Sequence, residues 1–246
     1  MTLFSGSRVP VGTWLKMAGP EPVEIVAHAG FDFVVVDLEH APLTLETAYR
    51  LVNSASALGM TPLVRVPDHT PSTLQKVLDA GAAGVLVPKV DTVAQAEAVG
   101  RAVRFPPDGD RGAGGTSRAG RWGLRPTAEY VGERVLCVPQ LESEQAIEAA
   151  PAILALPAVD AVFVGAADLS LSMGTTPDDP VVREMIARTL RYAAAAGKPC
   201  GLAFAAAGPA VRAIAQGCGF VVVSNDTSML ASAAVSLVRE IREERG

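Results

Sequence analysis

The chain has 246 residues, of which 49% are hydrophobic and 5% aromatic, and its 21 basic and 26 acidic side chains give a formal charge of −5. This acidic balance, without a cluster of basic and aromatic residues, argues against a nucleic-acid partner. The first residues lack the pattern of a signal peptide, and no apolar run reaches the roughly 20 residues that span a bilayer. We therefore expect a cytoplasmic protein with no membrane contact.

Short β-branched segments alternate with helical patterns along the chain. The predicted strands cover residues 11–16, 33–39, 62–66, 84–90, 136–141, 161–164, 201–204 and 220–224. The predicted helices cover residues 22–29, 43–58, 71–80, 93–103, 144–155, 179–196, 210–216 and 228–244. This strict alternation predicts an α/β fold of the closed (β/α)8 TIM-barrel type, and barrels of about 250 residues usually form one domain, here residues 1–246. An open doubly wound sheet also alternates, but no GxGxxG turn follows the first strand.

Local signals agree with these boundaries. Ser143 and Thr70 stand where N-caps are expected, and glycines that favour a left-handed helix end occur at Gly30, Gly59, Gly81 and Gly197. The three widely separated cysteines form no CxxC pair, so we expect buried reduced thiols rather than a disulfide or zinc site.

Residues 105–126, rich in Pro, Gly and Arg, interrupt the alternation. A long loop in a compact domain is usually functional or disordered, and Trp122 with the arginines favours an ordered one. We expect Trp122 to anchor the loop, and the loop to cover the active site or reach a neighbouring subunit. For Arg111, Arg118 and Arg121, roles in loop packing, subunit contacts or substrate contacts stay open.

Two acidic residues stand where strand patterns end: Glu142 follows the fifth strand and Asp168 follows the sixth. A lone acid there would more often cap a helix or face solvent. Because consecutive strand ends are neighbours at the active-site face of a barrel, the pair predicts a site for a hard divalent cation such as Mg²⁺ or Mn²⁺. Co²⁺ tolerates the same ligand types.

Earlier strand ends carry a possible base and an anion clamp. His40 has the near-neutral pKa that abstraction of a hydroxyl proton requires, and Asp37 is placed to orient it or relay its proton through water. Glu39 shares the strand face of Asp37 if the extended geometry persists. Arg65 offers a planar fork of donors for a carboxylate or enolate oxygen. The other two histidines are expected to be structural.

Taken together, these segments resemble the HpcH/HpaI aldolase family over about residues 12–230. The matching motifs are VDLEHAP at 36–42, VRVP at 64–67, LDAGA at 78–82, RFPPDGDRG at 104–112, RAGRWG at 118–123, QLES at 140–143 and GAADLS at 165–170. The resemblance implies a barrel of the phosphoenolpyruvate/pyruvate type. It also implies a class II, divalent-metal-dependent aldolase that splits 4-hydroxy-2-oxo acids into pyruvate and an aldehyde through a metal-stabilised enolate.

The resemblance also implies residue roles. Glu142 and Asp168 correspond to the metal ligands, His40 with Asp37 to the acid–base pair, and Arg65 to the arginine that holds the pyruvyl oxygens. Gln140 lies beside the metal, the backbone around Ala167 receives the substrate carboxylate, and the Asp79 position approaches the site of an adjacent subunit. The family's usual arrangement is a hexamer built as a dimer of trimers.

Two positions depart from the family pattern. Ala166 replaces the usual proline before the ligand Asp168, which should soften that turn without removing a ligand. Lys89 replaces the usual methionine, adds a charge near a strand end and is expected to alter aldehyde preference.

Two other functions stay open beside the aldolase. One is a CoA-thioester lyase of the citrate-lyase β type, which shares the barrel and the metal carboxylates; the other is a non-catalytic metabolite-binding barrel. A phosphate-handling isomerase is disfavoured, because the turns after the last two strands lack a Gly-rich cradle. The sequence does not select the aldehyde or the preferred cation.

Overall fold

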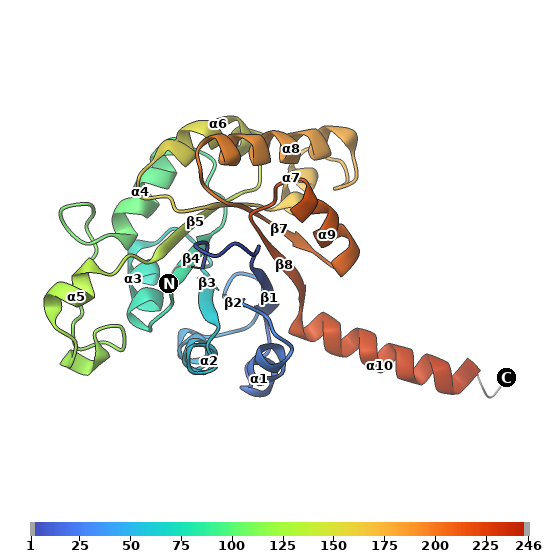
Figure 1. The fold of residues 1–246 in the computed structure, drawn as a ribbon, viewed down its shortest axis with the longest axis horizontal. Coiled ribbons are helices and arrows are strands. Elements are labelled where there is room, and N and C mark those ends of the chain that lie inside the picture. The colour runs from blue at the N-terminus through green and yellow to red at the C-terminus, as the bar shows by residue number, and fades with distance from the viewer. Residues whose placement is uncertain (1–2, 244–246) are drawn as a thin grey trace.

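A computed structural model describes residues 3–243. Within them, parallel strands follow one another around a closed barrel in the order β1 to β8, and β8 pairs with β1 (Figure 1). The strands are β1 Val11–Leu15, β2 Phe33–Asp37, β3 Thr61–Arg65, β4 Gly84–Val87, β5 Leu136–Leu141, β6 Val162–Val164, β7 Cys200–Phe204 and β8 Phe220–Asn225. The predicted fold class is confirmed.

Helices follow the strands, and most of them cover the outside of the barrel (Figure 1). They are α1 Glu21–His28, α2 Leu45–Ala57, α3 Pro71–Asp79, α4 Val93–Val103, α5 Thr127–Gly132, α6 Glu144–Ala155, α7 Ala166–Ser172, α8 Pro180–Ala195, α9 Ala207–Ala215 and α10 Asp226–Glu243, with a short 3-10 turn η1 at Arg121–Gly123. The sequence prediction missed α5, α7 and η1. These elements are one or two turns long, too short for a helical hydrophobic period to stand out.

The observed helix ends explain most of the boundaries. Gly30, Gly59, Gly81 and Gly197 all have the positive φ that was predicted for them. Ser143 caps α6 by accepting a hydrogen bond from the backbone N–H of Ala146 at 3.1 Å. Thr70 stands at the N-cap of α3 but makes no side-chain cap, and its backbone N–H donates to Asp68 Oδ1 at 2.8 Å.

Two apolar layers stabilise the barrel. Its interior is filled by large side chains, and the ring centroid of Phe220 lies 6.1 Å from that of Phe33 and 6.0 Å from that of Phe163. Gly201 on β7 faces the Phe220 ring, which leaves no room for a side chain at that position. Aliphatic side chains fill the second layer, between strands and helices. All three cysteines are buried free thiols, as predicted.

The second and fourth predicted strands extend past the observed ends at Asp37 and Val87. The backbone N–H groups of Glu39 and His40 both donate to Asp37 Oδ1 at 3.2 Å, which turns the chain away from the strand direction. Lys89 has a positive φ of 55°. These three residues therefore lie in loops at the carboxyl ends of the strands, and the extended geometry expected for Glu39 does not persist.

The loop over residues 105–126 is ordered differently from the prediction. Trp122 is 62% exposed, so its expected role as an anchor is wrong. Arg111 takes that role, because its buried guanidinium stacks 4.5 Å from the ring centroid of Phe105 and binds Asp79 at 2.9 Å. Since Asp79 ends α3, the loop lies away from the carboxyl ends of the strands and does not cover the site of its own chain.

Helix α10 projects from the barrel instead of packing back on it (Figure 1). It is joined to the barrel at its start, where buried Asp226 accepts hydrogen bonds from the backbone N–H of Lys16 at 3.0 Å and of Met17 at 2.9 Å. Beyond that point its apolar residues Leu230, Val235, Leu237, Val238 and Ile241 are exposed. Among residues 3–243, no helix combines the length and apolarity needed to cross a membrane.

We predict that Gly201→Ala destabilises the protein, because the added Cβ would collide with the Phe220 ring in the closed interior. Overpacking of this kind costs about 1–3 kcal/mol of the free energy of unfolding, which urea denaturation would measure. Gly115→Ala is the control, since a Cβ there meets open space. Equal stability of the two variants would contradict this description of the core.

Candidate active site

The carboxyl ends of β1, β2 and β3 meet at a buried ion-pair network. Asp37 and Arg65 are register partners as the last residues of β2 and β3. Arg65 donates from Nε to Asp37 Oδ1 at 2.9 Å and from Nη2 to Oδ2 at 2.8 Å. The Nζ of Lys16, just beyond β1, reaches Asp37 Oδ2 at 2.5 Å. A fully buried carboxylate is thus paired with two cations.

Arg65 is held on further sides. Its Nη1 lies 3.2 Å from Glu39 Oε2, and its guanidinium carbon lies 4.2 Å from the ring centroid of Trp14. A planar guanidinium fixed by a bidentate carboxylate and an aromatic face loses little further entropy when it binds a ligand oxygen. The network therefore presents Arg65 in one orientation.

The pKa of Asp37 shows which role this residue can take. Burial alone would raise its pKa, but the hydrogen bond and charge of Arg65, with the hydrogen bond of Lys16, lower it to about 2. Asp37 therefore stays ionised at neutral pH, as an anion paired with Arg65 and Lys16.

His40 is placed differently from the predicted acid–base pair. Its backbone N–H, not its ring, binds Asp37. The imidazole Nε2 lies 3.7 Å from Glu39 Oε2, and the side chain is 54% exposed. The His40 ring makes no direct contact with Asp37 in this structure, where Arg65 and Lys16 occupy that carboxylate, and the predicted acid–base pair stays a prediction. The role of His40 as a base stays a prediction.

Glu142 and Asp168 form the second part of the site. Glu142 follows β5, is buried, and accepts a hydrogen bond from the backbone N–H of Lys89 to Oε2 at 2.8 Å; its Oε1 contacts the Gln140 amide. Gly165 lies so close that a Cβ there would come within 2.9 Å of Oε1. Burial, added to the charges of Asp168 and Glu39, raises the pKa of Glu142 to about 7. The site is thus rich in negative charge.

These residues fit a hard divalent cation. Among residues 3–243 no group of three or more His, Cys, Asp and Glu side chains has metal-binding geometry. The available donors are instead the carboxylates of Glu142 and Asp168 and the buried Oε1 of Gln140, which has no hydrogen-bond partner in the described chain. A set of oxygens with only two carboxylates suits Mg²⁺ or Mn²⁺, which complete their coordination with water and substrate oxygens.

The two departures from the family pattern lie at this site. Lys89 contributes its backbone N–H to Glu142, while its side chain is 74% exposed with Nζ 3.9 Å from Glu39 Oε1. Ala166 begins α7 directly after Gly165, so the helix that carries Asp168 forms without the proline. Ala167 is exposed in the first turn of the same helix.

Asp79 is not brought to the other predicted site residues within one chain. At the end of α3 its Oδ1 accepts hydrogen bonds from Arg111 at 2.9 Å and from the Tyr130 hydroxyl at 3.2 Å. These partners belong to the opposite end of the barrel. Its approach to the site of an adjacent subunit stays a prediction.

Sequence reasoning missed Lys16 and Trp14 as parts of the site. A signal was present, since Lys16 is a charged residue directly after the apolar first strand, just as Asp37 ends the second. Trp14 lies two residues before Lys16, on the strand face that points the same way.

Comparison with known proteins identifies the family. The sequence model of the HpcH/HpaI aldolase/citrate lyase family matches residues 11–233, and the chain belongs to this family. It is 40% identical to a 2-keto-3-deoxy-L-rhamnonate aldolase of Klebsiella pneumoniae, over 91% of this chain and 85% of the relative. It is 38% identical to a hydroxypyruvate/pyruvate aldolase of Chromohalobacter salexigens, over 92% and 91%.

Solved structures agree with this assignment. A HpcH/HpaI aldolase/citrate lyase family protein from Burkholderia cenocepacia superposes with a TM-score of 0.92 at 32% sequence identity, over 98% of this chain and 97% of the other. The predicted resemblance is confirmed, and the family assignment supports an enzyme of the lyase class.

We predict that Arg65→Met destabilises the protein by roughly 3 kcal/mol at neutral pH, because it strands Asp37 as a buried anion with Lys16 as its remaining partner. In the parent protein the lowered pKa of Asp37 stabilises the folded state at pH values above 3.8, the ordinary pKa of this side chain. This contribution to stability is lost as the pH falls towards 2. In the variant, burial raises that pKa, so the destabilisation should shrink as the pH falls and Asp37 protonates.

Thermal and urea unfolding between pH 4 and pH 8 would measure the difference. Arg183→Met is the matched control, because Arg183 forms an exposed pair with Asp178 and such pairs contribute about 0–1 kcal/mol. A loss for Arg65→Met no greater than for the control would show that the buried pair does not stabilise the barrel.

Proposed function

We propose that the protein is a divalent-metal-dependent aldolase that reversibly cleaves 4-hydroxy-2-oxo acids to pyruvate, or a related 2-oxo acid, and an aldehyde. The observation that carries the proposal is that a pair of carboxylates and a fixed positive charge lie close together at one end of the barrel. The carboxylates of Glu142 and Asp168 repel each other, and beside them lies a fixed guanidinium with a charged network of its own. The two relatives compared above are aldolases, which supports the same class.

Each residue has a proposed part in the chemistry. Glu142 and Asp168 hold a divalent cation, with Gln140 beside it, and the cation supplies Lewis-acid stabilisation of enolate charge. Arg65 binds the oxygens of the 2-oxo acid and adds a fixed positive charge. The backbone N–H groups around Ala167, in the first turn of α7, receive the substrate carboxylate.

His40 is the proposed base for the 4-hydroxyl proton. Its ring is half-exposed beside Glu39, and we place the aldehyde portion of the substrate on that side of the site. Glu39 is the carboxylate nearest to the imidazole, so we assign the orientation of the ring to Glu39, while Asp37 fixes Arg65.

A CoA-thioester lyase is the second candidate, since the matching family includes citrate lyases as well as aldolases. Binding of a thioester would favour that reading. A non-catalytic barrel would leave the whole set of charged residues at the strand ends without a use, so we rank it last.

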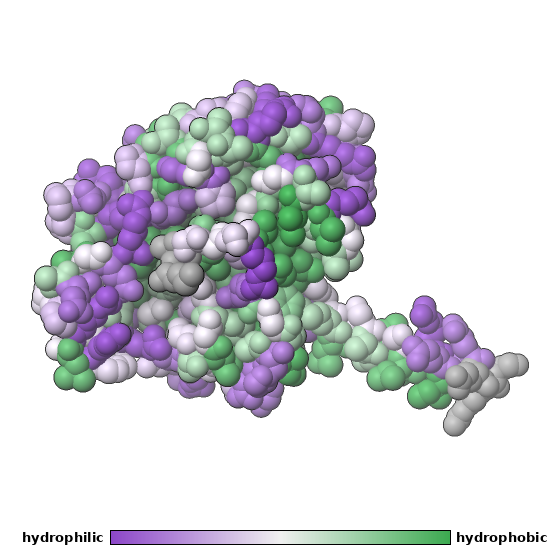
Figure 2. Space-filling view, viewed as in Figure 1, coloured by the Kyte–Doolittle hydropathy of each residue, from purple (hydrophilic) through white to green (hydrophobic). Residues whose placement is uncertain are grey.

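We also propose that the protein is a homo-oligomer in which α10 packs on a second copy. Leu230, Leu237 and Ile241 lie seven and eleven residues apart along one face of the helix and are exposed. Ile25 on α1 and Val211 on α9 are exposed on the barrel as well. Figure 2 shows apolar residues both on the projecting helix and on the barrel where it departs. Apolar patches of this kind mark interfaces.

Metal dependence is tested by pyruvate release from 4-hydroxy-2-oxo acids. Chelation should abolish release and Mg²⁺, Mn²⁺ or Co²⁺ should restore it, while Glu142→Gln should stay inactive with every cation. Because protons compete for Glu142, cation affinity should fall as the pH drops below about 7. Lys16 and Lys89 lie in the site, so borohydride trapping is the necessary control. Full activity without metal and a trapped lysine adduct would establish Schiff-base chemistry instead.

Variants of His40 and Arg65 should differ in their effects on aldol cleavage and on oxaloacetate decarboxylation, two reactions that pass through the same pyruvate enolate. His40→Ala should lose roughly 10²–10⁴-fold in aldol turnover, the range for a positioned acid–base group, yet keep most of its oxaloacetate decarboxylation, which removes no hydroxyl proton. Arg65→Lys, chosen to keep a cation beside Asp37, should impair both reactions. Pyruvate formation from both substrates at saturating metal measures the difference. Equal losses in the His40 variant would point to a structural role for the ring.

The oligomer is tested at α10. Replacing Leu237 and Ile241 together by Glu should lower the molar mass in light scattering, because two charges would enter an apolar contact. Ser232→Glu is the control on the opposite face of the helix and should leave the mass unchanged. A parent protein that is an active monomer would contradict the proposal.

A further inference from the structure

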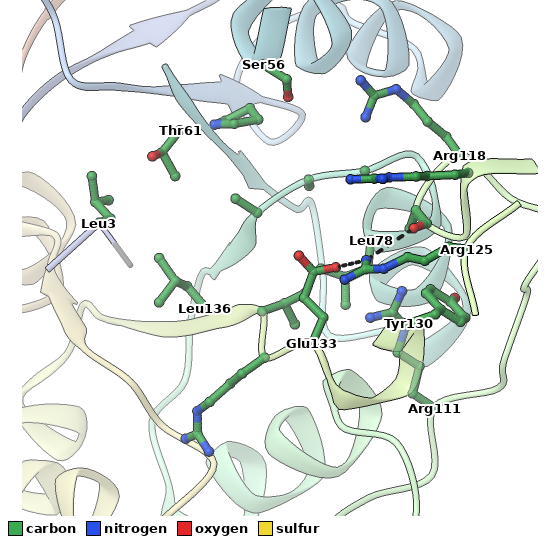
Figure 3. A pocket seen from close by; sticks show the side chains of 18 of the residues that line it. Leu3, Ser56, Thr61, Leu78, Arg111, Arg118, Arg125, Tyr130, Glu133 and Leu136 are labelled. Atoms are coloured by element: carbon green, nitrogen blue, oxygen red, sulfur yellow. Dashed lines mark hydrogen bonds and ion pairs between the residues drawn. The ribbon is translucent and has the colours of Figure 1, made fainter. Parts of the chain in front are cut away.

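A cavity lies at the end of the barrel opposite the proposed active site. Its volume is about 570 Å³, and its walls include Thr61 at the start of β3 and Leu136 at the start of β5. Figure 3 shows Arg118 and Arg125 reaching towards it from one side, with Leu3 and Leu136 on the other. Nothing in the proposed aldol chemistry uses this cavity.

The charges that line the cavity do not balance. Three of its arginines are paired: Arg111 with Asp79, Arg125 with Glu133, and Arg134 with Asp160. Among the residues that the structure describes, no carboxylate pairs with the two others, Arg118 and Arg121, and Glu133 is the one acidic residue in the lining. The cavity therefore has an excess of two positive charges.

The backbone of the loop that carries Arg118 and Arg121 is fixed by its own hydrogen bonds. The guanidinium of Arg118 occupies the space that a side chain at Gly81 would take. Arg121 and Trp122 have φ values of 51° and 59°, a conformation that costs free energy in residues other than glycine. Backbone hydrogen bonds from Arg121 N–H to Arg118 O at 2.8 Å and from Trp122 N–H to Ser117 O at 2.9 Å fix this turn.

One wall of the cavity has guanidinium groups without a carboxylate partner in the described part of the chain, and the opposite wall has apolar side chains. This arrangement suits an anion that carries a short organic body. Paired N–H donors match the oxygens of phosphate and carboxylate groups. The volume exceeds that of a bare oxyanion and leaves room for a short organic body. Glu133, beside Arg125, would repel such a ligand and so lowers its affinity for the cavity.

We propose that this cavity is a binding site for a small organic dianion, a phosphate monoester or a dicarboxylate, which engages Arg118, Arg121 and Arg125. Within one chain the site is separate from the carboxyl ends of the strands, and the titration below measures its occupancy without reference to aldolase activity.

Calorimetric titration of the full-length, metal-free protein at constant ionic strength tests the site. The probes are inorganic phosphate and succinate, and the preferred probe distinguishes the two anion types. We expect saturable binding of at least one probe. Arg118→Gln and Arg121→Gln should each weaken it about tenfold or more, as expected for the loss of a charge-assisted hydrogen bond. Glu133→Gln should tighten binding, because it removes the one opposing carboxylate.

Arg183→Gln changes the net charge by the same amount as the Arg118 and Arg121 variants, at an exposed position outside the cavity, and should leave the affinity unchanged. Trp122 lines the cavity, so its fluorescence should follow the same titration. Absence of saturable binding by both probes would overturn the proposal and leave the cavity as a surface for subunit packing. Equal affinity in Arg118→Gln, Arg121→Gln and Arg183→Gln would also overturn it.

Discussion

The bidentate pair between Asp37 and Arg65 is the interaction on which the rest of the site depends. It joins the ends of two neighbouring strands, and burial makes either partner costly without the other. Lys16 adds a tie to β1, and Trp14 and Glu39 confine the guanidinium from other sides. The barrel thereby holds a cation rigidly at the place where an oxyanion is to bind, so little reorganisation is needed during reaction.

A contrasting arrangement stands on β5 and α7. There burial and like charge raise the pKa of Glu142, a cost that binding of a cation would relieve. One end of the barrel thus contains a fixed guanidinium, whose counter-anion keeps a low pKa, and a carboxylate pair whose charge is uncompensated. Binding a 2-oxo acid between a divalent cation and Arg65 would use both.

The sequence predicted the barrel because its signals were local: β-branched runs, helix-ending glycines and polar residues at strand ends. It also predicted that Glu142, Asp168, Asp37 and Arg65 would gather at one face, since parallel strands end there. It did not predict which charges pair. The choice of Arg65 and Lys16 over the His40 ring as partners of Asp37 depends on strand register and on the turn at Glu39. The sequence also did not predict that α10 projects from the barrel or that Trp122 is exposed. The apolar residues of α10 and the tryptophan in the loop would be equally typical of segments packed against the barrel.

The most direct test of the central claim is the exchange of the methyl protons of pyruvate for deuterium, followed by proton NMR in deuterated buffer without any aldehyde. It isolates enolate formation from the carbon–carbon bond step. The account predicts exchange that requires Mg²⁺, Mn²⁺ or Co²⁺, stops on chelation and is lost in Glu142→Gln. Exchange at an undiminished rate in the metal-free protein, or none with metal present, would contradict it.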